Sequence, residues 1–130
     1  MKIIISNSSS VPIYEQIKNQ IINQIMLDEL LEGESIPSIR SLASDIKISV
    51  MTIKKAYDEL ESEGYINSVQ GKGTFVAPKN IELAKEQANK EIENHISKII
   101  NIASRFNIDK KEIIDLFEFI YRSEEQWVML

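Results

Sequence analysis

The chain has 130 residues, of which 43% are hydrophobic and 27% charged, so it can form one domain or a domain with a small appendage. It contains no cysteine, which excludes disulfides and thiolate metal sites and suits a reducing cytoplasm. No apolar run approaches the length of a membrane span, so we expect no membrane partner. The net charge of −5 disfavours nucleic acid as a default partner, because phosphate contacts normally need basic residues.

A short isoleucine cluster lies near the start of the chain. Ile3, Ile4 and Ile5 follow Lys2, and this run is too brief for a signal peptide. We expect it to form a small strand or an arm before the first helix.

A helix is predicted between Ser38 and Ile46. Pro37 fixes the backbone before it, and Ser38 can cap its first turn. Its apolar residues recur at helical spacing, at Ile39, Leu42, Ala43 and Ile46. Two residues, Lys47 and Ile48, then leave room only for a tight turn, after which Ser49 can cap a second helix.

The second helix is predicted from Val50 to Glu63. Its inward face has apolar residues at helical spacing, namely Ile53, Ala56, Tyr57 and Leu60. Its outward face is divided between an N-terminal half with Thr52, Lys54 and Lys55 and a C-terminal half with Asp58, Glu59, Glu61 and Glu63. Acids near a helix C-terminus oppose the helix dipole by about 0.3 to 1 kcal/mol each. A helix whose first half enters a phosphate-lined groove would explain this division, with the acidic half pointing away; a solvated helix with random charges is the alternative.

A hairpin is predicted next. Gly64 should end the helix, and residues 65–69 and 74–76 should form a two-stranded hairpin rich in aromatic and branched residues. Its tip, Gln70 to Gly73, contains two glycines that permit positive φ and a lysine that can meet a phosphate or enter a minor groove. Taken alone, the tip is better explained as an ordinary glycine-rich turn.

Basic residues are concentrated in the paired helices. Between residues 40 and 57 four basic residues stand against one acid, Asp45, a local charge of +3, and Lys72 adds to them from the hairpin. We therefore expect few phosphate contacts per subunit and a need for two subunits.

Two amphipathic helices are predicted after Pro78. The first, from about residue 80 to 106, has an apolar stripe of Ile92, Ile96, Ile99, Ile100, Ala103 and Phe106. Asp109 and Glu112 have the form of a capping box for the second, whose stripe includes Ile113, Leu116, Phe117, Ile120 and Tyr121. Two helices alone make a poor core. We expect the stripes to be buried in a homodimer, and packing within one chain is the alternative.

The first 76 residues resemble the winged-helix domain of GntR-family bacterial transcription regulators. The residues that carry the resemblance are Pro12, Tyr14, Gln16, Pro37, Ser38, Arg40, Leu42, Ala43, Ser49, Thr52, Ala56, Tyr57, Leu60, Gly64, Gly71, Gly73, Thr74, Phe75 and Val76. The resemblance implies a mostly α fold with a small β-hairpin wing: a winged helix-turn-helix domain over residues 1–78 and a two-helix dimerisation hairpin over residues 79–130. The short C-terminal part is similar to the YtrA-type subfamily. That likeness implies a repressor of its own operon, commonly one that encodes a membrane transporter.

The same resemblance implies which residues contact a double-stranded DNA operator. By position these are Arg40, Ser49, Val50, Met51, Thr52, Lys54, Gln70, Gly71 and Lys72, and Lys55 joins them from the same outward face. The family often has an arginine where Val50 stands and a small residue where Lys47 stands. A valine can contact a thymine methyl but cannot hydrogen-bond guanine, so the operator sequence does not follow from the family.

Three other functions compete with this interpretation. An enzyme is disfavoured by the single histidine, the missing cysteines and the lack of a nucleophile elbow, and we expect no cofactor or metal. A protein-interaction module should show aromatic anchors on the outward face of the 50–63 helix, where Met51 is the one large apolar residue. A ligand-gated regulator would hold an effector among residues of the C-terminal helices, such as His95, Phe119 and Trp127, and the sequence does not separate it from an ungated repressor.

Overall fold

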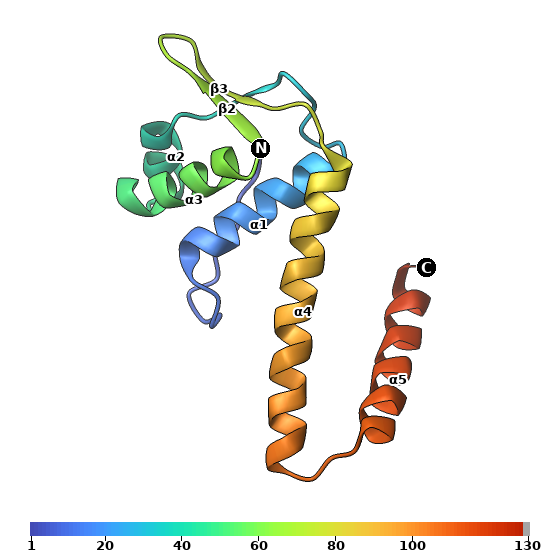
Figure 1. Cartoon of the computed structure of the whole chain (residues 1–130). Coiled ribbons are helices and arrows are strands. Elements are labelled where there is room, and N and C mark those ends of the chain that lie inside the picture. Colours follow the sequence, from blue (N-terminus) through green and yellow to red (C-terminus); the bar gives the residue numbers. More distant parts are fainter. Residues whose placement is uncertain (129–130) are drawn as a thin grey trace. The chain divides into compact units, whose positions relative to one another are not determined.

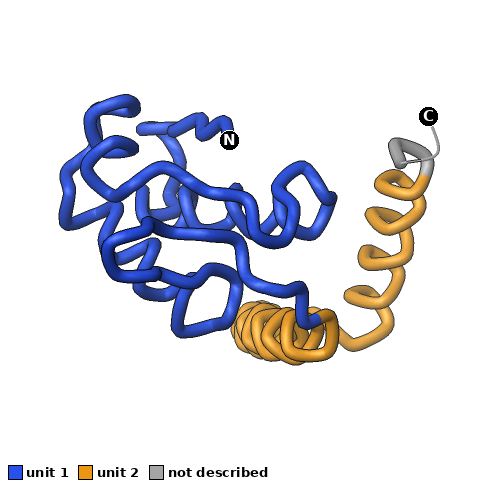
Figure 2. The backbone as a smooth tube through the Cα atoms, turned by 90° about the horizontal axis from the view of Figure 1, so that it is seen from above, with its two compact units in different colours: residues 1–80 blue, residues 81–130 orange. Residues whose placement is uncertain are grey.

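The structure, a computed structural model, describes residues 1–128, with side chains up to residue 125, and is mostly helical with one small sheet (Figure 1). In chain order its elements are α1 (Ile13–Met26), β1 (Ser35–Ile36), α2 (Ile39–Ile46), α3 (Val50–Ser62), β2 (Ile66–Val69), β3 (Gly73–Val76), α4 (Ile81–Arg105) and α5 (Lys110–Val128). The chain divides into two compact units, Met1–Asn80 and a second unit that begins at Ile81 (Figure 2).

The core of the first unit lies between its three helices and the sheet. One face of α1 is buried at a spacing of four residues, through Ile17, Ile21 and Ile25. α3 buries the four apolar residues that the sequence predicts, Ile53, Ala56, Tyr57 and Leu60. The strands and α2 contribute Ile36, Ile66, Val76, Leu42 and Ala43. The predicted pair of helices and the tight turn between them are therefore confirmed.

The sheet has three antiparallel strands in the order β1-β3-β2. β2 and β3 form the predicted hairpin, in which Ile66 pairs with Val76. The sequence did not predict the third strand, β1, which pairs with the other edge of β3, with Ser35 opposite Phe75. β1 has two residues, too few to show the alternation that marks a strand in a sequence. The wing is thus anchored by a third strand.

Residues 1–6 form an extended arm on α1, one of the two forms that the sequence predicts for them. Glutamine side chains on successive turns of α1 hydrogen-bond the backbone of alternate arm residues, Gln16 with Ser6, Gln20 with Ile4, and Gln24 with Lys2. The spacing fits, because four helical residues rise about 6 Å and two extended residues about 6.6 Å. The arm therefore belongs to the first unit.

α3 ends at the glycine that the sequence predicts. Gly64 has a φ of +86°, which is costly for a residue with a Cβ atom. The Tyr65 N–H donates to the Leu60 carbonyl at 2.9 Å and the Gly64 N–H to the Glu61 carbonyl at 3.1 Å, a Schellman closure. This closure satisfies the last carbonyls of α3 and directs the chain into β2.

The second unit consists of α4, α5 and the turn between them. Asp109 caps α5 as predicted, since its Oδ1 accepts the Glu112 backbone N–H at 2.9 Å. Seen along α4, α5 leads away from it beyond the turn (Figure 2). Ala103 is the one buried residue between positions 81 and 125. Within one chain, α4 and α5 therefore leave their apolar stripes largely open.

Candidate nucleic-acid interface

The first turn of α3 is held by a side-chain cap, and the residues that follow the cap are exposed to solvent. The Ser49 Oγ accepts the Thr52 backbone N–H at 3.2 Å and lies 2.8 Å from the Thr52 hydroxyl. The side chains of Val50 and Met51 follow, with Val50 46% and Met51 73% exposed. A capped, well-ordered turn of this kind can present methyl and hydroxyl groups to the edges of bases.

Two lysines follow on α3, and each has a partner within the first unit. The Lys54 Nζ lies 2.7 Å from the Asp58 Oδ2, but both side chains are more than half exposed, so this pair is weak and can exchange for another anion. The Lys55 Nζ lies 4.0 Å from the ring centroid of Tyr14 on α1, a cation–π contact. Of the two predicted DNA contacts, Lys54 is the freer to turn toward a ligand.

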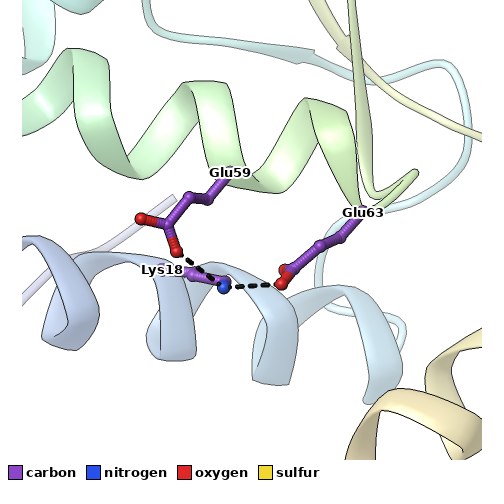
Figure 3. Close-up of polar contacts among 3 residues, drawn as sticks. All are labelled: Lys18, Glu59 and Glu63. Atoms are coloured by element: carbon purple, nitrogen blue, oxygen red, sulfur yellow. Dashed lines mark hydrogen bonds and ion pairs between the residues drawn. The ribbon is translucent and has the colours of Figure 1, made fainter.

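The acidic half of α3 is held by a lysine of α1. The Lys18 Nζ lies 3.0 Å from the Glu59 Oε1 and 2.8 Å from the Glu63 Oε1 (Figure 3). Burial alone would lower the pKa of Lys18, but the hydrogen bonds and charges of the two carboxylates raise it above its usual value. The sequence interpretation, in which the acidic half simply points away from DNA, missed this partner. Lys18 offsets the unfavourable charges at the C-terminal end of α3 and ties that end to α1.

Another acid of α3 is bonded to strand β2 of the wing. The Ser68 backbone N–H donates to the Glu61 Oε1 and its hydroxyl to the Oε2, both at 3.2 Å. Both bonds are exposed to solvent, yet together they define how β2 leaves α3. The helix and the wing are therefore joined by a side-chain contact as well as by the chain.

The tip of the wing is open and turned by its glycines. Gly71 and Gly73 have φ values of +79° and +122°. No atom lies within 4 Å of the position that a Cβ would take at Gly71, so this glycine is needed for its conformation and not for space. The predicted contacts Gln70, Gly71 and Lys72 are all exposed.

Three exposed cations near α3 and the wing have no carboxylate partner among residues 1–125. They are Arg40 on α2, Lys47 in the turn between the helices, and Lys72 at the wing tip. Elsewhere in the first unit ion pairs engage Lys18, Lys54 and Lys79. The positive charge available to an anion is thus carried by the start of α2, the turn after it and the wing tip, although the chain as a whole is acidic.

Tyr57 links α3 to the segment before α2. Its hydroxyl donates to the Pro37 carbonyl at 2.7 Å. Burial raises the pKa of Tyr57, so the hydroxyl stays protonated and remains a donor. Sequence reasoning assigned Tyr57 to the core but gave no sign of this bond.

The second unit exposes the predicted apolar stripes. Eight of the ten predicted interface residues are exposed by 44% or more: Ile92, Ile96, Ile99, Ile100, Phe106, Leu116, Phe117 and Ile120. Of the other two, Ala103 is buried and Ile113 is half-buried. Trp127, which the sequence suggested for an effector cleft, has its side chain outside the described residues. So many large apolar side chains exposed along two helices are unusual for a monomeric soluble protein.

Neither metal-binding nor membrane-spanning features are found in the described part of the chain. Residues 1–128 contain no group of three or more histidine, aspartate or glutamate side chains placed to hold a metal ion. None of their helices is long and apolar enough to cross a membrane.

Comparison with known proteins identifies the family. The profile of the bacterial regulatory proteins of the gntR family matches residues 13–76. YhcF of Bacillus subtilis, an uncharacterized HTH-type transcriptional regulator, is 33% identical over 107 residues, which make up 82% of this chain and 88% of YhcF. The chain belongs to the GntR family.

YtrA proteins and an operator complex refine this assignment. The repressor YtrA of Bacillus subtilis is 42% identical over 69 residues, 53% of each chain. The structure of YtrA from Sulfolobus acidocaldarius, a GntR-family transcription factor, matches with a TM-score of 0.61 and 36% identity over 73% of this chain and 97% of that one. AraR(DBD) in complex with operator ORX1 matches with a TM-score of 0.52 and 35% identity over 59% of this chain and 96% of that one. The protein is therefore a DNA-binding regulator of the YtrA type.

Proposed function

We propose that the protein is a homodimeric repressor that binds a pseudo-palindromic operator upstream of its own gene. The observation that supports this most is the exposed first turn of α3, fixed by the Ser49 cap and flanked by unpaired cations. In helix-turn-helix proteins the N-terminal part of the second helix contacts base edges in the major groove. In the proposal, α3 takes this place and the wing contacts flanking phosphates or a minor groove.

Each predicted contact then has a role. Met51, Thr52 and Lys54 contact base edges, and Val50 can touch a thymine methyl. Arg40 and Lys72 bind phosphates, since both are exposed and free of carboxylates. Of the remaining predicted contacts, Ser49 is the cap of α3 and Lys55 lies on the side of that helix. Gln70 and Gly71 lie at the wing tip.

The open stripes of α4 and α5 support the dimer. Eight large apolar side chains exposed along two helices are costly in water, and a second copy offers a stripe of the same chemistry and length. A dimer also doubles the small number of free cations that one first unit can offer to DNA. Pairing of two chains through their second units would therefore bury the stripes and bring enough cations to the DNA.

In this proposal the dimer represses transcription by occupying its operator. The relative YtrA is a repressor by name, and a dimer bound near a promoter can exclude RNA polymerase without further contacts. As the subfamily resemblance implies, we propose that the regulated genes are those of its own operon, which can include a membrane transporter.

Fluorescence anisotropy tests the proposal. The purified protein is titrated into labelled DNA from upstream of its own gene and into a scrambled duplex at several salt concentrations. We expect tight, salt-sensitive binding that prefers the native duplex. Equal and weak binding to both duplexes would contradict an operator-specific function.

A further inference from the structure

Lys47 adopts a backbone conformation that is unfavourable for its type. It caps the C-terminal end of α2 with φ +57° and ψ +45°, the left-handed region. Only two other non-glycine residues among those described have positive φ, Asp28 and Asn107, and aspartate and asparagine tolerate that region better than lysine does. A glycine at position 47 would form the same turn with less strain.

The turn itself does not use the Lys47 side chain. The backbone N–H groups of Lys47 and Ile48 both donate to the Ala43 carbonyl, which closes α2 without a side chain. The side chain is exposed and makes no ion pair with residues 1–125. By contrast, the other lysines between residues 18 and 55 each have a partner, Lys18 with Glu59 and Glu63, Lys54 with Asp58, and Lys55 with Tyr14.

The position of Lys47 suggests what the side chain is for. It lies two residues before the Ser49 cap, at the junction of α2 and α3. When the first turn of a helix enters the major groove, the turn before it runs close to the sugar-phosphate backbone. Strained residues that persist without a structural need are candidates for function.

We propose that Lys47 is a further DNA contact, whose ammonium group binds a phosphate of the operator backbone beside the first turn of α3. This inference rests on the proposed function and adds a residue to its interface. A phosphate contact is indifferent to base sequence. Lys47 would therefore add to the affinity for every duplex and to the salt dependence of binding.

The test compares Lys47→Gly with the wild-type chain. Glycine removes both the backbone strain and the charge, so stability and DNA affinity should not fall together. The Tm should stay the same or rise. The affinity should fall about three- to tenfold on the native and the scrambled duplex alike. The slope of log affinity against log salt should become shallower by about one per subunit.

Three further variants complete the design. Lys47→Arg keeps the charge, so binding and slope should stay close to the wild type. Lys47→Asn is neutral and tolerates positive φ, so it should bind like Lys47→Gly even if glycine loosens the turn. Lys111→Ala, which removes an exposed cation of the second unit, is the control for net charge and should keep the wild-type slope.

The outcomes separate this inference from the proposed function. If wild-type protein binds neither duplex, the proposed function fails. If the wild type binds and Lys47→Gly and Lys47→Asn bind equally well with the same slope, Lys47 makes no phosphate contact. A loss confined to the native duplex, or an equal loss in Lys47→Arg, would also overturn the inference.

Discussion

The two units of this chain treat apolar and charged side chains differently. The first unit buries its apolar residues between three helices and a sheet, and apart from Lys2 in the arm its free cations are Arg40, Lys47 and Lys72. The second unit buries one alanine between residues 81 and 125 and exposes two apolar stripes. The first unit therefore has a buried core of its own, whereas the second unit acquires one in the homodimer that we propose.

The largest expected effect comes from a charge in the open stripe. We expect Ile99→Asp, at a position 44% exposed, to shift the protein to monomer because burying a carboxylate among apolar side chains is unfavourable. A monomer has lost the second, linked DNA-binding unit of the dimer, and this loss should lower operator affinity by on the order of a hundredfold or more. Light scattering and anisotropy measure the two effects. Leu27→Asp, on a 70% exposed leucine of the first unit, is the matched control, and a monomeric Ile99→Asp that binds fully would refute the coupling.

A smaller effect is expected for the base contacts of α3. Lys54→Ala should reduce the ratio of specific to non-specific affinity by about 1 to 3 kcal/mol if Lys54 makes a bidentate base contact. Asp58→Asn removes the ion-pair partner of Lys54 and keeps the lysine, so it should preserve that ratio. Competition titrations with native and scrambled duplexes measure it, and an unchanged ratio in Lys54→Ala would contradict the assignment.

The ion pairs of Lys18 should affect stability rather than sequence preference. Lys18→Met leaves two carboxylates without their cation, and we expect a loss of about 1 to 2 kcal/mol in unfolding free energy. The pKa of Lys18 is higher in the folded chain than its usual 10.5, so this contribution is fully present below that pH and is lost as the pH rises through the folded-state value.

Denaturant unfolding of the wild type and Lys18→Met at pH 7 and above pH 11 checks this expectation. The difference between the two proteins is the quantity to follow, because Tyr57, whose pKa burial raises, also destabilises the fold at high pH in both. A difference that persists undiminished at high pH would show that charge is not the cause.

The smallest expected effect is at the wing. Lys72→Ala should weaken binding to every duplex by a few fold and reduce the salt slope by about one per subunit, because one exposed phosphate contact is lost. Gln70→Ala changes the same tip without a change in charge and should leave the slope as it is. Anisotropy over a salt series distinguishes them, and a loss limited to the native duplex would instead assign Lys72 to base recognition.

The sequence predicted what depends on local pattern. Helical spacing located the buried faces of α2 and α3, and capping residues located their starts at Ser38 and Ser49, where the structure shows both caps. Gly64 and Asp109 likewise marked a helix end and a helix start. These features depend on residues a few positions apart, so a single sequence contains their signal.

Contacts between distant residues could not be predicted in the same way. β1 has two residues and is defined by its pairing with β3, in which Ser35 lies opposite Phe75, 40 positions away. The Lys18 cluster spans 41 and 45 positions, and the Tyr57 bond to Pro37 spans 20. The left-handed conformation of Lys47 was equally hidden, because lysine gives no signal for it, although the small residue usual in the family at that position was a hint.

The most direct test of the central claim is a hydroxyl-radical footprint of the protein on DNA from upstream of its own gene. If paired second units place two copies of α3 in successive major grooves, the footprint should show two equivalent protected half-sites about one helical turn apart, with the wings extending protection outward. A single protected half-site, or protection without a preferred position, would contradict the proposal that the first unit binds DNA while the second unit pairs two chains.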